Sequence, residues 1–298
     1  MPGEPPYGLI ANGLKKGKVI PFFGAAASAI YRPSGGKWKP GEPFMPFGGE
    51  LARNLAEEAS FGDVGDEELD LAFIASWVEH CQGTRSDVNS ALRRSFLVDA
   101  KPGGLHKALA KLPRLRLYIT TNYDDLLEKA LDSRNPFVIT DCGARGLWLR
   151  APGGAPERVQ ASNLRRIIED AVTGEPSAPV IFKMHGSISR EDEKHDSYLI
   201  TEEDYVDFLG KAGGKYLPPY IHDLLAGKKL LFLGYSLEDW NVRVIVRKLL
   251  RSLPPNDRRF YAIVKGRSER AQDIWHAHDL NIYSMNLLEF VQKLVKKL

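Results

Sequence analysis

The sequence predicts an α/β protein built on a doubly wound parallel sheet with an inserted helical subdomain. Two observations carry this prediction. First, apolar runs of strand length alternate with helical patterns, at residues 18–23, 116–120, 178–184, 229–235, 259–264 and 281–285; this alternation is typical of parallel sheets, whose strands need crossover connections. Second, an all-helical stretch separates the first two runs, residues 38–112, and is too long for a simple crossover.

Length and composition fit one large globular domain. The chain has 298 residues, of which 43% are hydrophobic and 27% are charged, enough for a sizeable core. We expect a single domain over residues 1–298, with residues 38–112 as a helical insertion within it. Residues 142–158 are rich in glycine and proline, and we expect them to form a long surface loop.

Composition also disfavours several classes of protein. The chain has two cysteines, Cys81 and Cys142, which excludes a disulfide framework and a four-cysteine zinc site. It has no run of 18 apolar residues and no signal-peptide layout at its N-terminus, so we expect a cytoplasmic protein. A net charge of +3 neither requires nor excludes a nucleic-acid partner.

The first apolar run ends in a turn of unusually small residues, GAAAS at positions 24–28. Gly24 can adopt a positive φ, and Ser28 can cap a helix or contact a phosphate. Small side chains let a ligand approach the amides of the next helix, which attract anions. Close packing of the helix on the sheet would explain the same residues, so the turn alone leaves both interpretations open.

Three later strand ends are also polar or small. TTNYDD, residues 120–125, follows the second run, where a helix cap explains Asn122 or Asp124 but not the whole cluster. KMHGS, residues 183–187, places His185 where an imidazole could act as a general base; a core histidine bonded to the backbone is the alternative. GYSLEDWN, residues 234–241, repeats the small and polar theme. Ligands bind beyond the carboxyl ends of strands in such sheets.

Taken in order, FFGAAAS, TTNYD, KMHGS and FLGYSLED resemble the sirtuin-like NAD-binding domains of prokaryotes, over about residues 18–265. The resemblance implies a Rossmann-like fold that takes NAD. It implies that the NAD pyrophosphate contacts Gly24, Ala25 and Ser28. This chain departs from the family pattern at Ala26, where a second glycine is usual, and a positive φ there would cost alanine about 1–2 kcal/mol.

The resemblance also assigns roles at the other strand ends. Asn122 corresponds to the residue that serves cleavage of the nicotinamide–ribose bond, and His185 to the catalytic base. The remaining predicted NAD contacts are Thr121, Asp124 near the carboxamide, and Gly234, Tyr235 and Ser236 on the adenosine side. No metal is implied.

The activity that the resemblance implies is hydrolysis of NAD+ to ADP-ribose and nicotinamide, an NAD+ glycohydrolase of EC 3.2.2 type, in bacterial anti-phage defence by NAD depletion. The chain leaves no room for a sensor domain, so we expect a homo-oligomer and a separate protein partner, such as a DNA-translocase-type ATPase or an Argonaute-like sensor. The missing cysteines disfavour an NAD-dependent deacylase, because those enzymes carry a four-cysteine zinc module.

Two alternatives come from other functional classes. A module that senses NAD or ADP-ribose without turnover would use the same pocket, although it would need neither Asn122 nor His185. A nucleic-acid interface could use the basic residues around one late helix, Arg243, Arg247, Lys248, Arg251, Arg258 and Arg259. No aromatic residues interleave with these charges, so a solvated outer face explains them better, and no direct nucleic-acid binding is expected.

Overall fold

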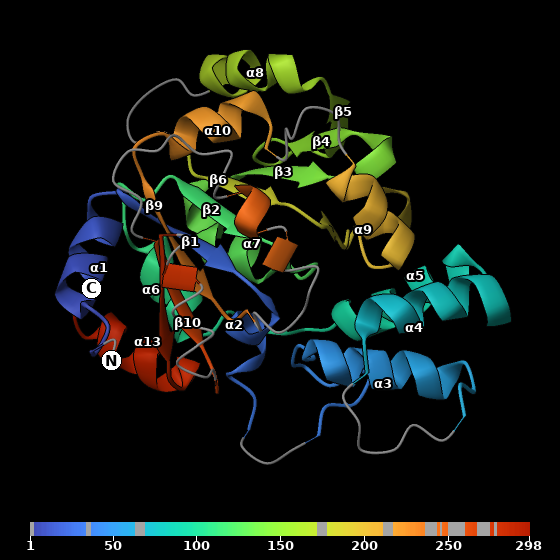
Figure 1. The fold of residues 1–298 in the computed structure, drawn as a ribbon. Coiled ribbons are helices and arrows are strands. Elements are labelled where there is room, and N and C mark those ends of the chain that lie inside the picture. The colour runs from blue at the N-terminus through green and yellow to red at the C-terminus, as the bar shows by residue number, and fades with distance from the viewer. Residues whose placement is uncertain are drawn as a thin grey trace.

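The computed structural model describes residues 3–33, 37–62, 69–171, 178–210, 217–235, 243–244, 246–249, 260–266, 275–276 and 279–298. A nine-stranded sheet with the order β11-β10-β9-β1-β2-β6-β3-β4-β5 forms its centre (Figure 1). The strands are β1 (Val19–Phe23), β2 (Leu117–Thr120), β3 (Phe137–Asp141), β4 (Leu147–Arg150), β5 (Pro156–Val159), β6 (Val180–Lys183), β9 (Lys229–Leu233), β10 (Phe260–Val264) and β11 (Leu280–Ser284).

The strand order confirms the doubly wound sheet. In the sheet, β2, β6 and β3 lie in that order on one side of β1, and the later strands β9, β10 and β11 lie on its other side. All of these neighbouring pairs are parallel. The order therefore reverses between β1 and β9. In sheets of this type, the crevice at that reversal is where ligands bind.

The expectation of a long loop over residues 142–158 is wrong. This stretch contains β4 and β5, an antiparallel hairpin that extends the sheet from β3. Gly143, Gly146 and Gly153 do adopt a positive φ in its turns. The glycines therefore mark the ends of short strands. Pairing of β4 with β3 and of β5 with β4 gives these strands hydrogen-bonding partners that local sequence does not reveal.

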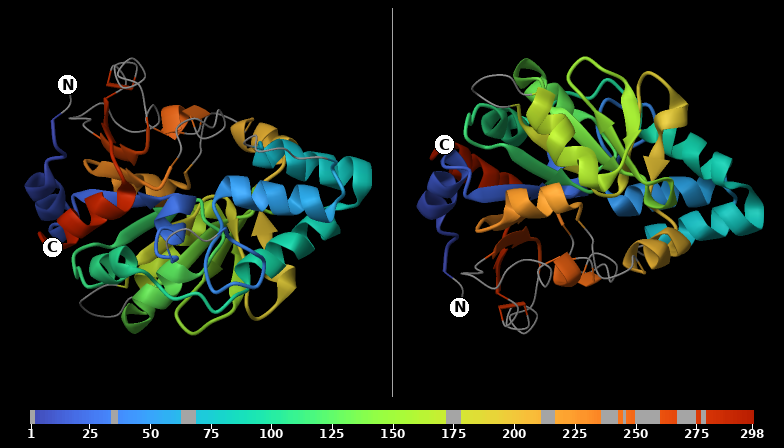
Figure 2. Two further views of the ribbon diagram at one scale, coloured as in Figure 1. Left: turned by 90° about the horizontal axis from the view of Figure 1, so that it is seen from below. Right: turned by 90° about the horizontal axis from the view of Figure 1, so that it is seen from above.

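Helices cover the sheet and group at one of its ends. They are α1 (Tyr7–Lys15), α2 (Ala25–Ala29), α3 (Gly48–Glu58), α4 (Leu71–Trp77), α5 (Arg85–Phe96), α6 (Gly104–Ala110), α7 (Leu126–Leu131), α8 (Leu164–Ala171), α9 (Glu202–Leu209), α10 (Pro219–Leu225) and α13 (Leu287–Val295). Helices α1 and α13 lie side by side, so the two ends of the chain are close together (Figures 1 and 2). No described helix is long and apolar enough to cross a membrane.

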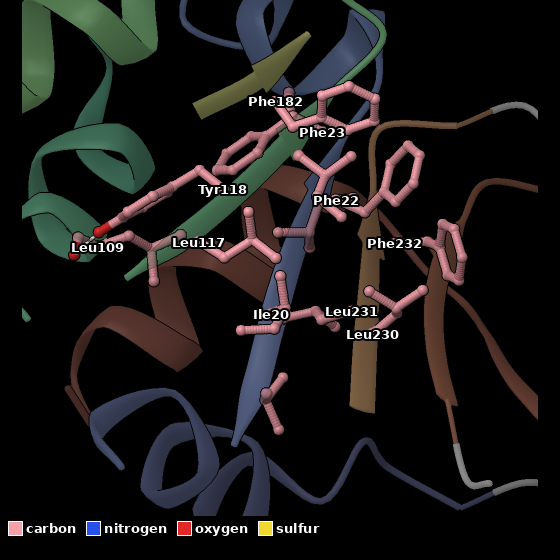
Figure 3. Close-up of a cluster of buried hydrophobic side chains, with 14 of the residues drawn as sticks. Ile20, Phe22, Phe23, Leu109, Leu117, Tyr118, Phe182, Leu230, Leu231 and Phe232 are labelled. Carbon is pink, nitrogen blue, oxygen red and sulfur yellow. Dashed lines mark hydrogen bonds between the residues drawn. The ribbon is translucent and has the colours of Figure 1, made fainter. Parts of the chain in front are cut away.

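The main core lies between the sheet and the helices packed on it. Figure 3 shows its centre, where Phe22 and Phe23 of β1 lie among side chains of β2, β6, β9 and α6. Every residue of β1, β2 and β6 is buried. Strands covered on both faces read as continuous apolar runs, which is why the sequence identified these three.

A second apolar cluster joins α3, α4 and α5 to the strand ends. It contains Leu51, Ile74 and Leu92 of these helices together with Tyr123, which follows β2, and Tyr198. Figures 1 and 2 show the three helices grouped at one end of the molecule. By contrast, α6 belongs to the main core through Leu105 and Leu109. We propose that the inserted subdomain is the part with its own core, α3 to α5.

Candidate functional site

The described parts of the four sequence motifs lie at the carboxyl ends of four neighbouring strands. Phe23 of β1 is in register with Leu233 of β9 and with Thr120 of β2, and Thr120 is in register with Lys183 of β6. These four neighbouring strands therefore end in one row. Asn122 and His185 each lie two residues beyond the Thr120–Lys183 pair, so the topology brings the two predicted catalytic residues to adjoining strand ends.

The turn after β1 and the end of β9 cross at backbone contact. Gly24 N–H donates to Leu233 O at 2.8 Å, and Ala26 N–H donates to Gly234 O at 3.1 Å. A Cβ on Gly24 would lie 2.6 Å from Gly234 O, and one on Gly234, whose φ is +80°, would lie 2.3 Å from Ala27 N. Both glycines are thus required by close approach at the point where the strand order reverses.

Ala26 carries no backbone strain. It lies inside α2, and it is not among the described non-glycine residues with positive φ. The departure from the family glycine therefore does not bring the cost expected for alanine at a left-handed position. Ala25 begins the same helix and is exposed, which leaves the start of α2 open on that side.

A hydrogen-bonded chain fixes the side chain of Asn122. Its Nδ2 donates to Gly24 O and to Ser28 Oγ, both at 3.0 Å. Ser28 is buried, and its hydroxyl also bonds to the Asp124 carboxylate. A carbonyl can only accept a hydrogen bond, so Gly24 O determines which end of the amide is Nδ2. Both amide hydrogens are used, and the amide oxygen remains as an acceptor.

Asp124 is a buried carboxylate whose charge is disfavoured by its surroundings. Burial raises its pKa above the usual value, while the nearby Lys183 ammonium and hydrogen bonds from Leu126 N–H and Ser28 oppose that rise. Its Oδ1 accepts from Leu126 N–H at 3.0 Å, in the first turn of α7. Asp124 thus accepts from the first residue of α7, whose N-cap is Asp125, and it also bonds to Ser28.

Thr121 and Tyr235 join the ends of β2 and β9 across β1. Their hydroxyl oxygens are 2.9 Å apart, and Tyr235 Oη also donates to Phe23 O at 3.0 Å. The Tyr235 ring is buried and lies edge-on against Phe22 and Phe232. Its side chain therefore holds the strand ends together in this structure, and its predicted contact with adenosine stays a prediction.

We expect Tyr235→Phe to lower the free energy of unfolding by about 1–3 kcal/mol, because the buried Phe23 carbonyl and Thr121 hydroxyl each lose a partner. Urea unfolding followed by circular dichroism measures this change. Tyr283→Phe is the matched control, since the Tyr283 hydroxyl has no hydrogen bond among the described residues. Equal stability of the two variants would contradict the bridging role.

His185 lies in an aromatic setting at the end of β6. The centroid of its ring lies 5.7 Å from the ring centroid of Tyr205 and 5.7 Å from that of Phe208, both on α9 and both in T-shaped geometry. Only 4% of His185 is exposed. Its carbonyl accepts from Leu199 N–H at 2.9 Å. The next residue, Gly186, has φ +95°, and a Cβ there would lie 2.0 Å from Ser197 O. Tyr205 thus contacts His185.

Sequence reasoning missed Lys183. The side chain is completely buried, and its ammonium donates to Tyr123 O, Asp124 O and Glu128 Oε1. The available signal was a lysine inside the apolar run APVIFKM, at a position where a parallel strand is buried on both faces. Buried lysines are rare unless paired, so the sequence could have predicted a paired, buried lysine at this position.

Some predicted positions cannot be placed. Ser236 lies outside the described residues, as do Arg251, Arg258 and Arg259 of the basic group. Within the described part, Lys248 donates to Leu209 O at 2.8 Å and the Arg247 guanidinium lies 5.6 Å from the Trp275 ring. These two cations therefore make contacts within the protein, and the expectation of no direct nucleic-acid binding stays a prediction.

A separate cavity lies beside the candidate site. Its volume is about 450 Å³, and it is bounded by α7, β3, β4 and the segment after β7 (Gly186–Ser187), with Trp148, Arg150 and His195 in its wall. None of the predicted site residues lines it. Among the described residues, no group of three or more His, Cys, Asp or Glu side chains could hold a metal ion.

The fold and the residues at its strand ends together define an α/β protein of the Rossmann-like class. Gly24 and Gly234 make a close backbone contact, and the Asn122 amide and the His185 imidazole follow adjoining strands. The chain belongs to the family of SIR2-like domains, whose family model matches residues 116–283, more than half of the chain. Asn122, His185 and Gly234 lie within the matched region, and the GAAAS turn precedes it.

Curated relatives carry related names. The chain is 29% identical over 260 residues to "NAD(+) hydrolase ThsA" of Acinetobacter baumannii, covering 86% of this chain and 44% of that protein. It is 27% identical to the protein of the same name from Bacillus cereus, covering 76% and 41%. It is 26% identical to "Defense-associated sirtuin 2" of Bacillus subtilis, covering 53% and 13%. The chain thus spans less than half the length of these relatives.

A solved structure described as "Structural Basis for the Mechanism and Regulation of Sir2 Enzymes" aligns with 98% of this chain and 96% of its own. The TM-score is 0.38 and the identity is 12%. A similarity this loose decides nothing about fold or function.

Proposed function

We propose that this chain is an NAD+ hydrolase that cleaves the bond between nicotinamide and ribose, and that it serves bacterial anti-phage defence by depleting NAD. The activity would be of EC 3.2.2 type, with NAD as substrate and with nicotinamide and ADP-ribose as products. The names of the relatives from Acinetobacter baumannii and Bacillus cereus support the activity, and the name of the Bacillus subtilis relative supports the context of defence.

The fixed orientation of the Asn122 amide is the observation that carries the proposal. Both Nδ2 hydrogens are engaged by Gly24 O and Ser28 Oγ. No hydrogen bond to Asn122 Oδ1 exists among the described residues. An amide held in this way offers only its oxygen, which accepts the O–H of a water or of a ribose hydroxyl and so aligns it for attack.

The chemistry of the bond fits such a site. Nicotinamide leaves NAD+ as a neutral molecule, so its departure needs no general acid, and the transition state resembles an oxocarbenium ion. What remains for the protein is to position the attacking oxygen and to accept its proton. Asn122 would do the first and His185 the second, and a positioned base typically contributes about 10²–10⁴-fold in rate.

The binding roles follow the strand edge. Gly24 and Gly234 bring two backbones into contact at the reversal of strand order, and Ala25 is exposed at the start of α2. We assign the NAD pyrophosphate to this turn, with Ser28 acting mainly through its bonds to Asn122 and Asp124. We further propose a cytoplasmic homo-oligomer that acts with a separate protein partner; these points come from the resemblance alone.

The test is to incubate the purified chain with NAD+ and to quantify nicotinamide and ADP-ribose by chromatography. We expect release by the parent, loss of release in Asn122→Ala, and parental activity in Asn12→Ala, which removes an exposed asparagine of α1. Circular dichroism shows that each variant is folded.

Silence of the parent would contradict the proposal if it persisted at every protein concentration and in the presence of the protein encoded beside it. NAD binding under those conditions, measured by calorimetry, would favour a module that senses NAD without turnover. Release that Asn122→Ala retains in full would leave the activity but remove Asn122 from it.

A further inference from the structure

Lys183 is an unusual feature of the sheet edge. It is the last residue of β6 and no part of it is exposed, while its partner Glu128 of α7 has 11% of its side chain exposed. Their Nζ and Oε1 atoms are 2.9 Å apart. Burying such a pair carries a desolvation penalty for each ion that the attraction between them must offset. Hydrophobic residues of similar volume often stabilise a fold equally well. Stability alone is therefore a poor explanation for this lysine.

The contacts of Lys183 connect the two catalytic strands. Its ammonium donates to Tyr123 O at 3.2 Å and also to Asp124 O, the carbonyls of the two residues that follow Asn122. The lysine itself precedes His185 by two positions on the neighbouring strand. One ammonium group thus joins the backbone beyond Asn122 to the strand that carries His185.

The charge of Lys183 acts on the same chain of hydrogen bonds. An ionised Asp124 can only accept a hydrogen bond, so Ser28 must donate to it and present a lone pair to Asn122 Nδ2. A protonated Asp124 could instead donate to Ser28, which would free the hydroxyl hydrogen to turn toward Asn122. The charged form of Asp124 therefore keeps the amide oriented, and Lys183 favours that form against burial.

We propose that Lys183 is a positioning residue for Asn122, acting through the backbone of residues 123–124 and through the hydrogen bond between Asp124 and Ser28. This inference rests on the proposed function, because the reaction gives it its readout.

The groups that face Asp124 come from three elements. They are Lys183 of β6, Glu128 and the Leu126 N–H of α7, and Ser28 of α2. Lys183, Leu126 N–H and Ser28 favour the carboxylate, whereas burial and the negative Glu128 disfavour it. Loss of Lys183 therefore raises the pKa of Asp124 further. On this proposal the ionised form of Asp124 holds Asn122 in place, so the acid limb that Asp124 sets in the pH profile should move to higher pH.

The experiment compares three variants by steady-state NAD+ cleavage across pH. We expect Lys183→Met to lower kcat about 10²-fold, the scale of a small misplacement of a catalytic group, with little change in KM and with the acid limb at higher pH. Lys183→Arg keeps the charge, so its acid limb should stay at the parental pH even if kcat falls. Lys107→Met removes an exposed lysine of α6 and should match the parent.

The double variant Lys183→Met/Glu128→Gln guards against misfolding, because it removes the buried ammonium and the carboxylate of its ion-pair partner together. We expect it to fold and to keep the low kcat and, if the charge of Lys183 acts as inferred, an acid limb different from that of the parent. A folded double variant with parental kcat and parental pH profile would overturn the inference while leaving the proposed function intact. A parent that never releases nicotinamide would instead refute the proposed function and the inference with it.

Discussion

We expect His185→Ala to lower kcat for NAD+ cleavage by about 10²–10⁴-fold, the contribution typical of a positioned general base. The effect should fall on kcat more than on KM, because proton transfer occurs only in the transition state. His185 is buried against Tyr205 and Phe208, so alanine also leaves a cavity there. His185→Gln fills more of that space and should be nearly as inactive.

The measurement is nicotinamide release under saturating NAD+, with NAD+ affinity determined separately by calorimetry. His276→Ala is the control, since this histidine is exposed. Among the described residues its ring has one hydrogen bond, an exposed one between Nδ1 and Asn281 Oδ1. If His185→Ala bound NAD+ as the parent does and released nicotinamide at the parental rate, His185 would not be the base.

Gly234→Ala should have the largest effect on stability. The residue has φ +80°, which costs alanine about 1–2 kcal/mol. Its new Cβ would also lie 2.3 Å from Ala27 N and 3.0 Å from Gly24 O, both backbone atoms that cannot rotate away. Overpacking of this kind adds about 1–3 kcal/mol. We therefore expect a total loss of about 2–5 kcal/mol, with loss of NAD+ binding, because the crossing of β1 and β9 must open.

Gly227→Ala separates the two causes. Gly227 has φ +68°, and a Cβ there would meet no atom within 4 Å, so it carries the strain without the clash. Thermal and urea unfolding of both variants measure the difference. Equal destabilisation by the two substitutions would mean that the contact between the strand ends contributes nothing.

Much of the sheet could be predicted from the sequence because most of its parallel strands are buried on both faces. The predicted runs KVIPFF, RLYIT, APVIFKM, KLLFLGY and RFYAIV each contain an observed strand, and NIYSM covers all of the partly buried β11 except Leu280. Strands β3, β4 and β5 were not predicted. β4 and β5 are short and only partly buried, and their state depends on pairing along the edge of the sheet rather than on their own composition.

The candidate site divides in the same way. The four strand-end motifs, taken together and in order, indicated Asn122, His185 and Gly24, because ligands bind beyond the carboxyl ends of strands in such sheets. The contact between Gly24 and Gly234 was not readable, nor was the chain from Asn122 through Ser28 to Asp124. These partners come from strands far apart along the sequence, and only the sheet register places them together.

The sequence by itself therefore determined the parallel sheet and the residue types at each strand end, because burial and turn chemistry act locally. The tertiary structure decided that Asn122 and His185 occupy adjoining strand ends, that Ala26 is helical and unstrained, and that Lys183 is buried beneath the residues after Asn122. The physical reason is that strand order and register arise from the packing of the whole sheet, which no short segment encodes.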